Sequence, residues 1–265
     1  MLNRILIVAL IAGFVTGVAV TAIQLGSSIP IIQYAESFEN AVGDEVGVAG
    51  HKHTNDSAAL SHDHNGAGMV AGHEPWVPED GIERVFWAGI TNVLLGFGAA
   101  LLIAAGLLLH GLFLRKPVNS LIGLAWGGAA FLTFSLAPAL GLPPELPGSS
   151  AAALDARQVW WIGTAVATAM GLAMIAYCRW LWMVPAIGLL LLPHVIGAPH
   201  PEVHESLVPA SVEESFIVIS VGTSMIFWLM LGSLTASLVR RMNLIDRERI
   251  SETAAVAAAG GDDRE

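Results

Sequence analysis

Histidines interspersed with acidic residues are the side chains of this chain whose types and spacing could do chemistry. Seven of the nine histidines lie in two stretches, 50–74 and 199–205, that also contain Asp or Glu. Neutral imidazole and carboxylate together suit borderline divalent metals such as cobalt, nickel and zinc. The first stretch contributes five candidate metal ligands and the second contributes two: His51, His53, His62, His64 and His73, then His200 and His204.

His194 is a further candidate ligand because of its place in the chain. It follows Pro193 near the end of an apolar segment, and a proline removes one backbone hydrogen bond from a helix. Irregular backbone at membrane depth is tolerated where it lines a cavity, and transporters place ion sites there. The alternative role of His194 is a structural hydrogen bond to the end of a neighbouring helix.

The second stretch has the spacing of a ligand pair. His200 and His204 are four residues apart, so they share one helix face if a helix begins at Pro201. This lone pair is a weak signal, and it is not a metalloprotease motif because no glutamate directly follows the first histidine. We predict that the pair and His194 form the mouth of an ion path together with one of two glutamates, Glu36 or Glu39.

The first stretch lies in a segment between two apolar runs, from residue 24 to residue 84. Residues 31–39 have helical spacing, which puts Glu36 and Glu39 about one turn apart on one face. Residues 42–72 are rich in Gly, Ala, Ser, His and Asp and lack apolar periodicity, which is typical of a flexible segment. We interpret its histidines as a metal-capturing arm, and the alternative is a solvated linker without metal contact.

The composition predicts that membrane-spanning helices position these residues. Of the 265 residues, 54% are hydrophobic and 13% are charged, and the mean hydropathy is +0.65. Soluble domains have about 25% charged residues, and a span needs about 20 apolar residues. We predict an all-α integral membrane protein whose membrane domain, 1–240, precedes a cytoplasmic tail at 241–265. About six transmembrane helices are expected, at 5–23, 85–109, 118–140, 159–177, 181–197 and 216–239.

The distribution of charge predicts the orientation of these helices. Lys and Arg concentrate on the cytoplasmic side of membrane proteins. With the N-terminus inside, nine of the twelve basic residues lie on the inner side and sixteen of the twenty-two acidic residues lie on the outer side. Both termini are therefore predicted to be cytoplasmic and the His-bearing segments extracytoplasmic. Acidic outer loops would concentrate cations, and the alternative is that they serve only solubility.

The first apolar run has two interpretations. The small residues at its end resemble a signal-peptide cleavage site. Its length and the Gly13-x-x-x-Gly17 spacing favour a retained helix that packs closely against another. Polar residues inside the spans, such as Asn92, are expected to bond between helices more often than to bind substrate. Glu145 and Ser135, near the end of the third span, are additional candidates for the lining of the mouth.

The sequence disfavours several functional classes. A net charge of −10 argues against a nucleic-acid partner, and the single cysteine, Cys178, excludes a disulfide framework. No Gly-x-x-x-x-Gly-Lys-Ser/Thr motif is present, so the chain has no recognisable phosphate loop of an ATP-driven motor. No nucleophile or paired acid–base set predicts catalysis. We therefore expect a non-enzyme without a tightly bound cofactor.

Several blocks along the chain are similar, in order, to a known family. They are the first helix with Ala35-Glu36, the segment Gly81-Ile82-Glu83-Arg84, and the blocks 134–148 (FSLAPALGLPPELPG), 157–161 (RQVWW) and 192–201 (LPHVIGAPHP). With these blocks the chain resembles the CbtA family of predicted cobalt transporter subunits over nearly its whole length. The resemblance implies cobalt uptake across the cytoplasmic (inner) membrane of a prokaryote, linked to cobalamin synthesis. It also implies a small companion, CbtB, with one membrane span and a histidine motif.

The residues and the resemblance together predict a membrane subunit that imports a divalent transition metal. Co²⁺ is implied by the resemblance, whereas the ligands alone would also accept Ni²⁺ or Zn²⁺. The lipid bilayer is the expected surrounding, and the sequence leaves the oligomeric state open. The alternative function is a membrane-anchored metal-binding accessory or sensor without its own transport path. A metal-dependent membrane enzyme or assembly factor is a third interpretation, without a supporting motif.

Overall fold

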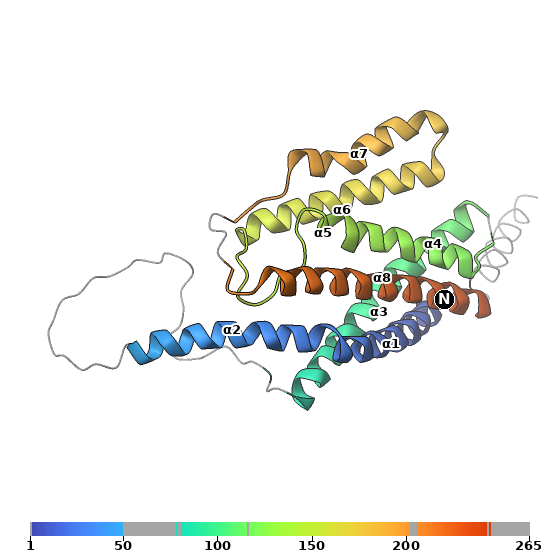
Figure 1. Cartoon of the computed structure of the whole chain (residues 1–265). Coiled ribbons are helices and arrows are strands. Elements are labelled where there is room, and N and C mark those ends of the chain that lie inside the picture. The colour runs from blue at the N-terminus through green and yellow to red at the C-terminus, as the bar shows by residue number, and fades with distance from the viewer. Residues whose placement is uncertain are drawn as a thin grey trace, which may run out of the picture.

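The computed structural model describes residues 2–49, 78, 81–115, 117–201, 206–242 and 244. Within these residues every regular element is a helix (Figure 1). The elements are α1 (Leu2–Gly26), α2 (Ser28–Ala49), α3 (Ile82–Phe113), α4 (Ser120–Phe131), η1 (Leu132–Leu136), α5 (Ala137–Ala139), α6 (Leu154–Tyr177), η2 (Trp180–Trp182), α7 (Met183–Ile196) and α8 (Ala210–Arg241). The prediction of an all-α fold is confirmed.

Five segments of the described chain are long and apolar enough to cross a membrane: α1, α3, α4 through α5, α6 and α8. The fifth predicted span corresponds to a shorter apolar segment, Trp180–Ile196. Large apolar side chains such as Leu94, Leu191 and Val195 are exposed on the surface of the bundle. Lipid tails are as apolar as these side chains, so the exposed faces fit an integral membrane protein.

Helices α1, α3, α4, α6, α7 and α8 run in alternating directions, and α2 continues from α1 in the same direction (Figure 1). α1 begins and α8 ends at the same end of the bundle, where Val8, Leu108 and Val239 share one buried cluster. We call this the hairpin end, because it also carries the short links after α3 and α6. The opposite end carries α2 and the loop segments 140–153, 197–201 and 206–209, and we call it the proline-loop end.

Glycines bring α1 and α3 into close contact. A Cβ atom added at Gly17 would lie 2.7 Å from the Cα atom of Val93, and one at Gly96 would lie 2.7 Å from the carbonyl oxygen of Gly13. Any larger residue would therefore push the two backbones apart, which is why small residues occur at such interfaces. The predicted packing role of the Gly13-x-x-x-Gly17 spacing is confirmed.

A second glycine contact joins α4 to α8. A Cβ atom at Gly123 would lie 2.5 Å from the carbonyl oxygen of Gly232, and Gly127 lies against the backbone of Trp228. We call this contact, made by Gly123, Gly127 and Gly232, the glycine seam. Because α8 also packs on α1 and α3, it is the central helix of the bundle.

The third predicted span is divided by a π-helical turn. α4 begins after Asn119, whose side-chain oxygen accepts a 2.9 Å hydrogen bond from the backbone N–H of Ile122 and so caps the helix. The π turn η1 follows, and Pro138 lies in the next turn. Pro138 lacks the N–H that would pair with the carbonyl of Phe134 in a regular α-helix. π turns within helices are frequent at functional sites.

Helix α2 extends beyond the helix expected in this region. The prediction of a helix at 31–39 is confirmed, but the assignment of residues 42–49 to an irregular arm was wrong, because α2 continues to Ala49. A helix held at its start adds one hydrogen bond for each further residue, so it propagates into a sequence without apolar periodicity. The start of α2 is held at the proline-loop end, where Ala35 is buried with Val208 and Phe216.

Candidate functional site

A cavity of about 280 Å³ lies at the proline-loop end, between residues 141–152, residues 199–201 and the start of α8. Three titratable side chains line it: Glu145, His200 and Glu213. Several prolines form its walls, and their fixed φ angles hold the loops in shape. We call it the mouth cavity.

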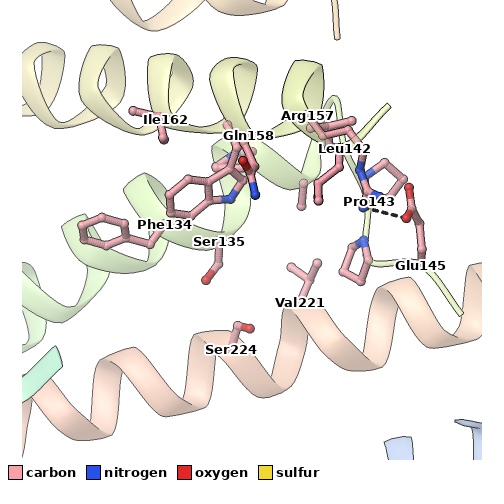
Figure 2. A pocket seen from close by; sticks show the side chains of 15 residues that line it. Phe134, Ser135, Leu142, Pro143, Glu145, Arg157, Gln158, Ile162, Val221 and Ser224 are labelled. Carbon is pink, nitrogen blue, oxygen red and sulfur yellow. Dashed lines mark ion pairs between the residues drawn. The ribbon is translucent and has the colours of Figure 1, made fainter. Parts of the chain in front are cut away.

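The two carboxylates of the mouth cavity have different partners. Glu145 Oε2 lies 2.7 Å from Nη2 of Arg157, in the first turn of α6 (Figure 2). Glu213 Oε1 instead accepts hydrogen bonds from the hydroxyls of Ser149, at 2.8 Å, and Ser206, at 2.6 Å. Arg157 compensates the charge of Glu145, whereas Glu213 has no basic partner among the described residues. The mouth cavity therefore keeps one uncompensated carboxylate, which favours a cation.

The pair of Glu145 and Arg157 also lines a second cavity of about 630 Å³ (Figure 2). This second cavity shares residues 142–145 with the mouth cavity, so the ion pair lies at the border between the two. Both side chains are less than a third exposed, which strengthens their attraction relative to a surface pair. Polar side chains from three helices complete the lining: Ser135, Gln158 and Ser224.

Two further cavities continue this series. The first, of about 670 Å³, lies between α1, α3, η1 and α8 and shares Ser135 and Ser224 with the second cavity; we call it the central cavity. The other, of about 440 Å³, shares Trp228 with the central cavity and extends to His110 and Tyr177 near the hairpin end. His110 Nδ1 lies 3.2 Å from Tyr177 Oη there. Neighbouring cavities therefore share wall residues along the length of the bundle.

Phe134 of the π turn is a wall common to the second cavity, the central cavity and the cavity of about 440 Å³. Its ring stacks on Trp161, with centroids 6.3 Å apart, and on Trp228, with centroids 5.5 Å apart. The indole N–H of Trp228 donates a 3.0 Å hydrogen bond to the hydroxyl of Ser135. The π turn thus places an aromatic side chain and a hydroxyl where the cavities meet.

Of the predicted mouth residues, the structure describes the side chains of His194, His200 and Glu36, and these three have different surroundings. His200 is exposed and lines the mouth cavity. His194 is half-buried on α7 with its ring edge-on to Trp160, 5.9 Å between centroids, and it lines none of the four cavities. Glu36 pairs with Arg84 at 2.7 Å. In the part of the chain that the structure describes, no group of three or more His, Cys, Asp or Glu side chains could hold a metal ion.

The remaining predicted ligands lie outside the described residues. They are His51, His53, His62, His64, His73 and His204, together with the side chain of Glu39. Their part in metal binding stays a prediction.

Asn92 bonds between helices, as predicted. Its amide nitrogen donates to Thr21 Oγ1 at 3.0 Å and to Gln24 Oε1 at 2.6 Å on α1. Glu145 and Ser135, expected to lie near one opening, both line the second cavity.

The polar face of α8 was not predicted from the sequence. Ser220, Thr223 and Ser224 recur at helical spacing within an apolar helix, and all three line the central cavity. The helical spacing of these hydroxyls is visible in the sequence. It does not indicate a cavity by itself, because hydroxyls in membrane helices usually bond within the protein.

Comparison with known proteins adds one finding. The family model of the probable cobalt transporter subunit (CbtA) matches residues 2–240. No curated protein and no solved structure is significantly similar to the chain.

Proposed function

Because the chain belongs to the CbtA family of probable cobalt transporter subunits, we propose that it forms the membrane path through which Co²⁺ is imported. The family match over nearly the whole membrane region carries this proposal. The series of cavities through the bundle supports it, because a transport path needs space lined by polar groups. The activity proposed is movement of an ion without catalysis.

We further propose that the proline-loop end faces the outside of the cytoplasmic membrane. Most of the described basic residues lie in or next to helix ends at the hairpin end, which is the pattern of a cytoplasmic face. They are Arg4, Arg115, Arg179, Arg240 and Arg241, whereas Arg84 and Arg157 pair with glutamates toward the other end. The mouth cavity then receives the ion, with Glu213 and His200 as its first contacts. The histidines of 50–74 raise the local metal concentration beside it, and each is individually dispensable.

The Glu145–Arg157 pair is the next element on this path. An ion that leaves the mouth cavity for the second cavity passes this border, where Glu145 can attract it and Arg157 repels it. The ion therefore enters the second cavity only when it competes with Arg157 for the carboxylate of Glu145.

Uptake of radiolabelled cobalt tests the proposed function. Cells without their own cobalt importers would express the chain with and without a small single-span companion of the CbtB type, with nickel and zinc as competitors. The variants are His200→Ala, in the mouth cavity, and His194→Ala, on Trp160. We expect His200→Ala to weaken uptake several-fold at scarce cobalt and His194→Ala to weaken it less. No uptake by the wild type in either setting would contradict the proposal.

The arm has a separate test. Deletion of residues 50–73 should weaken uptake at scarce cobalt and spare it at abundant cobalt, because a concentrating arm matters only when the ion is limiting. Equal loss at both concentrations would contradict the proposed role of the arm.

A second function, that of a metal-binding accessory, is favoured by one observation. Five of the predicted metal ligands lie together in the segment 50–74, between two predicted spans, so the chain could bind metal there while a companion supplies the path. Metal binding by the purified protein without any uptake would support this alternative.

A further inference from the structure

Three hydroxyl side chains of α8 line the central cavity without a protein partner. Ser220, Thr223 and Ser224 take part in no hydrogen bond among the described residues. Elsewhere on the same helix, Ser215 and Ser237 donate to the backbone carbonyl four residues earlier, both within 2.8 Å. Burying a hydroxyl in apolar surroundings without a hydrogen bond costs about 1–3 kcal/mol. The three hydroxyls therefore call for a polar occupant in the space that they face.

Thr223 makes this argument strongest, because it is only 8% exposed and still lines the cavity. Thr16, Thr168 and Thr235 are also buried without a hydrogen-bond partner. They differ from Thr223 because they line none of the four cavities described above. The hydroxyl of Thr223 therefore lacks a hydrogen-bond partner at a position where the cavity offers space for one.

The rest of the polar lining is neutral and rich in oxygen. Asn92 uses its amide nitrogen on α1, which leaves its oxygen as an acceptor. The hydroxyl of Ser135 accepts from Trp228 and keeps its own hydrogen for another partner. Among the described residues, none of those that line the central cavity is Asp, Glu, His, Cys, Lys or Arg.

Neutral oxygens of this kind suit the water around a cation better than the cation itself. Water molecules on a divalent ion are strong donors, and hydroxyl and amide oxygens accept from them. A shell of six waters occupies roughly 180 Å³ at about 30 Å³ each, well within the cavity of about 670 Å³. Small divalent ions with firmly held water are bound in this way, with several waters kept.

We infer that the central cavity is a binding site for a divalent cation that keeps its water shell. The inference rests on the proposed function for the identity of the ion as Co²⁺. The face of α8 made by Ser220, Thr223 and Ser224 accepts hydrogen bonds from the shell, and Asn92 faces it from α3. Selection by ligand chemistry then occurs before this cavity, because its hydroxyls touch water rather than metal.

Cysteine modification tests the site without a transport assay. The single native cysteine, exposed Cys178, is first replaced by alanine. Ser220→Cys, which lines the central cavity and none of the other three, is compared with Thr168→Cys in purified protein in lipid nanodiscs. Thr168 is a buried position of α6 that lines no described cavity. Thiols react as thiolates, which need water to form. We expect a charged methanethiosulfonate to modify the Ser220→Cys thiol at least tenfold faster, and equal rates would overturn the inference.

The water shell is tested in the same sample by protection. Hexaamminecobalt(III) carries six ligands that do not exchange, so it can occupy only a site that binds an intact shell. We expect Co²⁺ and hexaamminecobalt(III) both to slow modification of the Ser220→Cys thiol several-fold and to leave the Thr168→Cys thiol unaffected. Protection by Co²⁺ alone would show direct metal contact and would overturn the inference, as would the absence of protection by either ion.

Uptake gives a second readout. Thr223→Val preserves shape and removes a hydroxyl, and Ser215→Ala removes a hydroxyl that bonds to the α8 backbone outside the cavity. We expect Thr223→Val to lower cobalt uptake several-fold at unchanged thermal stability, with Ser215→Ala unaffected. Unchanged uptake in Thr223→Val would count against the site. If the wild type transports nothing, the proposed function fails, while the cysteine experiment still decides whether the cavity binds the ion.

Discussion

The two faces of helix α8 are built in opposite ways. Toward α4, Gly232 meets Gly123 and Gly127 so closely that no side chain fits between the backbones. Toward α1, α3 and η1, the same helix presents hydroxyls to a cavity of about 670 Å³. The glycine seam gives close van der Waals packing, which is what drives helix association in lipid. Because the glycine seam holds α8 against α4, the face of α8 toward α1, α3 and η1 can border a cavity without separating the helices.

The largest effect is expected when the glycine seam is filled. Gly127→Val places a branched side chain against the backbone of Trp228, and overpacking costs about 1–3 kcal/mol or more when backbone must move. We expect a lower melting temperature in detergent and little folded protein. Gly163→Val is the matched control, because a Cβ there meets nothing within 4 Å. Equal melting temperatures for the two variants would show that the seam does not hold the helices together.

Filling the opposite face should affect activity and not stability. Ser224→Leu adds apolar volume to the central cavity, where space is available, and it removes a hydroxyl without a protein partner. We therefore expect a melting temperature equal to or above that of the wild type, with cobalt uptake lost. A melting temperature as low as that of Gly127→Val would contradict the proposed difference between the two faces of α8.

A smaller effect is expected at the border of the mouth cavity. Arg157→Gln removes the positive charge 2.7 Å from Glu145 and leaves a second uncompensated carboxylate beside Glu213. We expect the KM for cobalt to fall several-fold at low ionic strength, and the change to shrink as salt screens the charges. Glu145→Gln should raise the KM instead. A KM that moves in the same direction in both variants would contradict an electrostatic role.

The smallest effect is expected where the packed and open regions meet. Asn92 joins α3 to α1 through Thr21 and Gln24 and also lines the central cavity. Interhelical hydrogen bonds in membranes contribute about 0.6 kcal/mol on average. Asn92→Leu removes two such bonds and should therefore lower the unfolding free energy by about 1.2 kcal/mol in a reversible denaturation series. A loss above about 2 kcal/mol would show that Asn92, like the glycine seam, is needed to hold the helices together.

The fold was predictable from the sequence because its main signals are local. Apolar runs longer than a bilayer core mark the spans, and the Gly13-x-x-x-Gly17 spacing marks the close contact of α1 with α3. The length of α2 was underestimated because its second half lacks apolar periodicity, although a helix continues once its first turns are held by packing.

The site was less predictable because it depends on contacts between distant residues. Nothing near Glu145 in the sequence indicates that Arg157 neutralises it, and nothing near Glu36 indicates its pairing with Arg84. The histidine spacing drew attention to His194, which contacts Trp160, whereas the hydroxyls of α8 carry a weaker sequence signal. A residue type predicts which ion it can bind, but only the fold decides which groups face the same space.

The apolar segment formed by η2 and α7 is short for a membrane span. The segment Trp180–Ile196 has 17 residues, which at about 1.5 Å each reach roughly 26 Å. The hydrocarbon core of a bilayer is about 30 Å thick, and a helix that is too short is accommodated by local thinning at a modest cost. The bilayer beside α7 is therefore expected to be thinner than beside α3 or α8, which have 32 residues each. Membranes of different thickness would then favour this protein to different degrees.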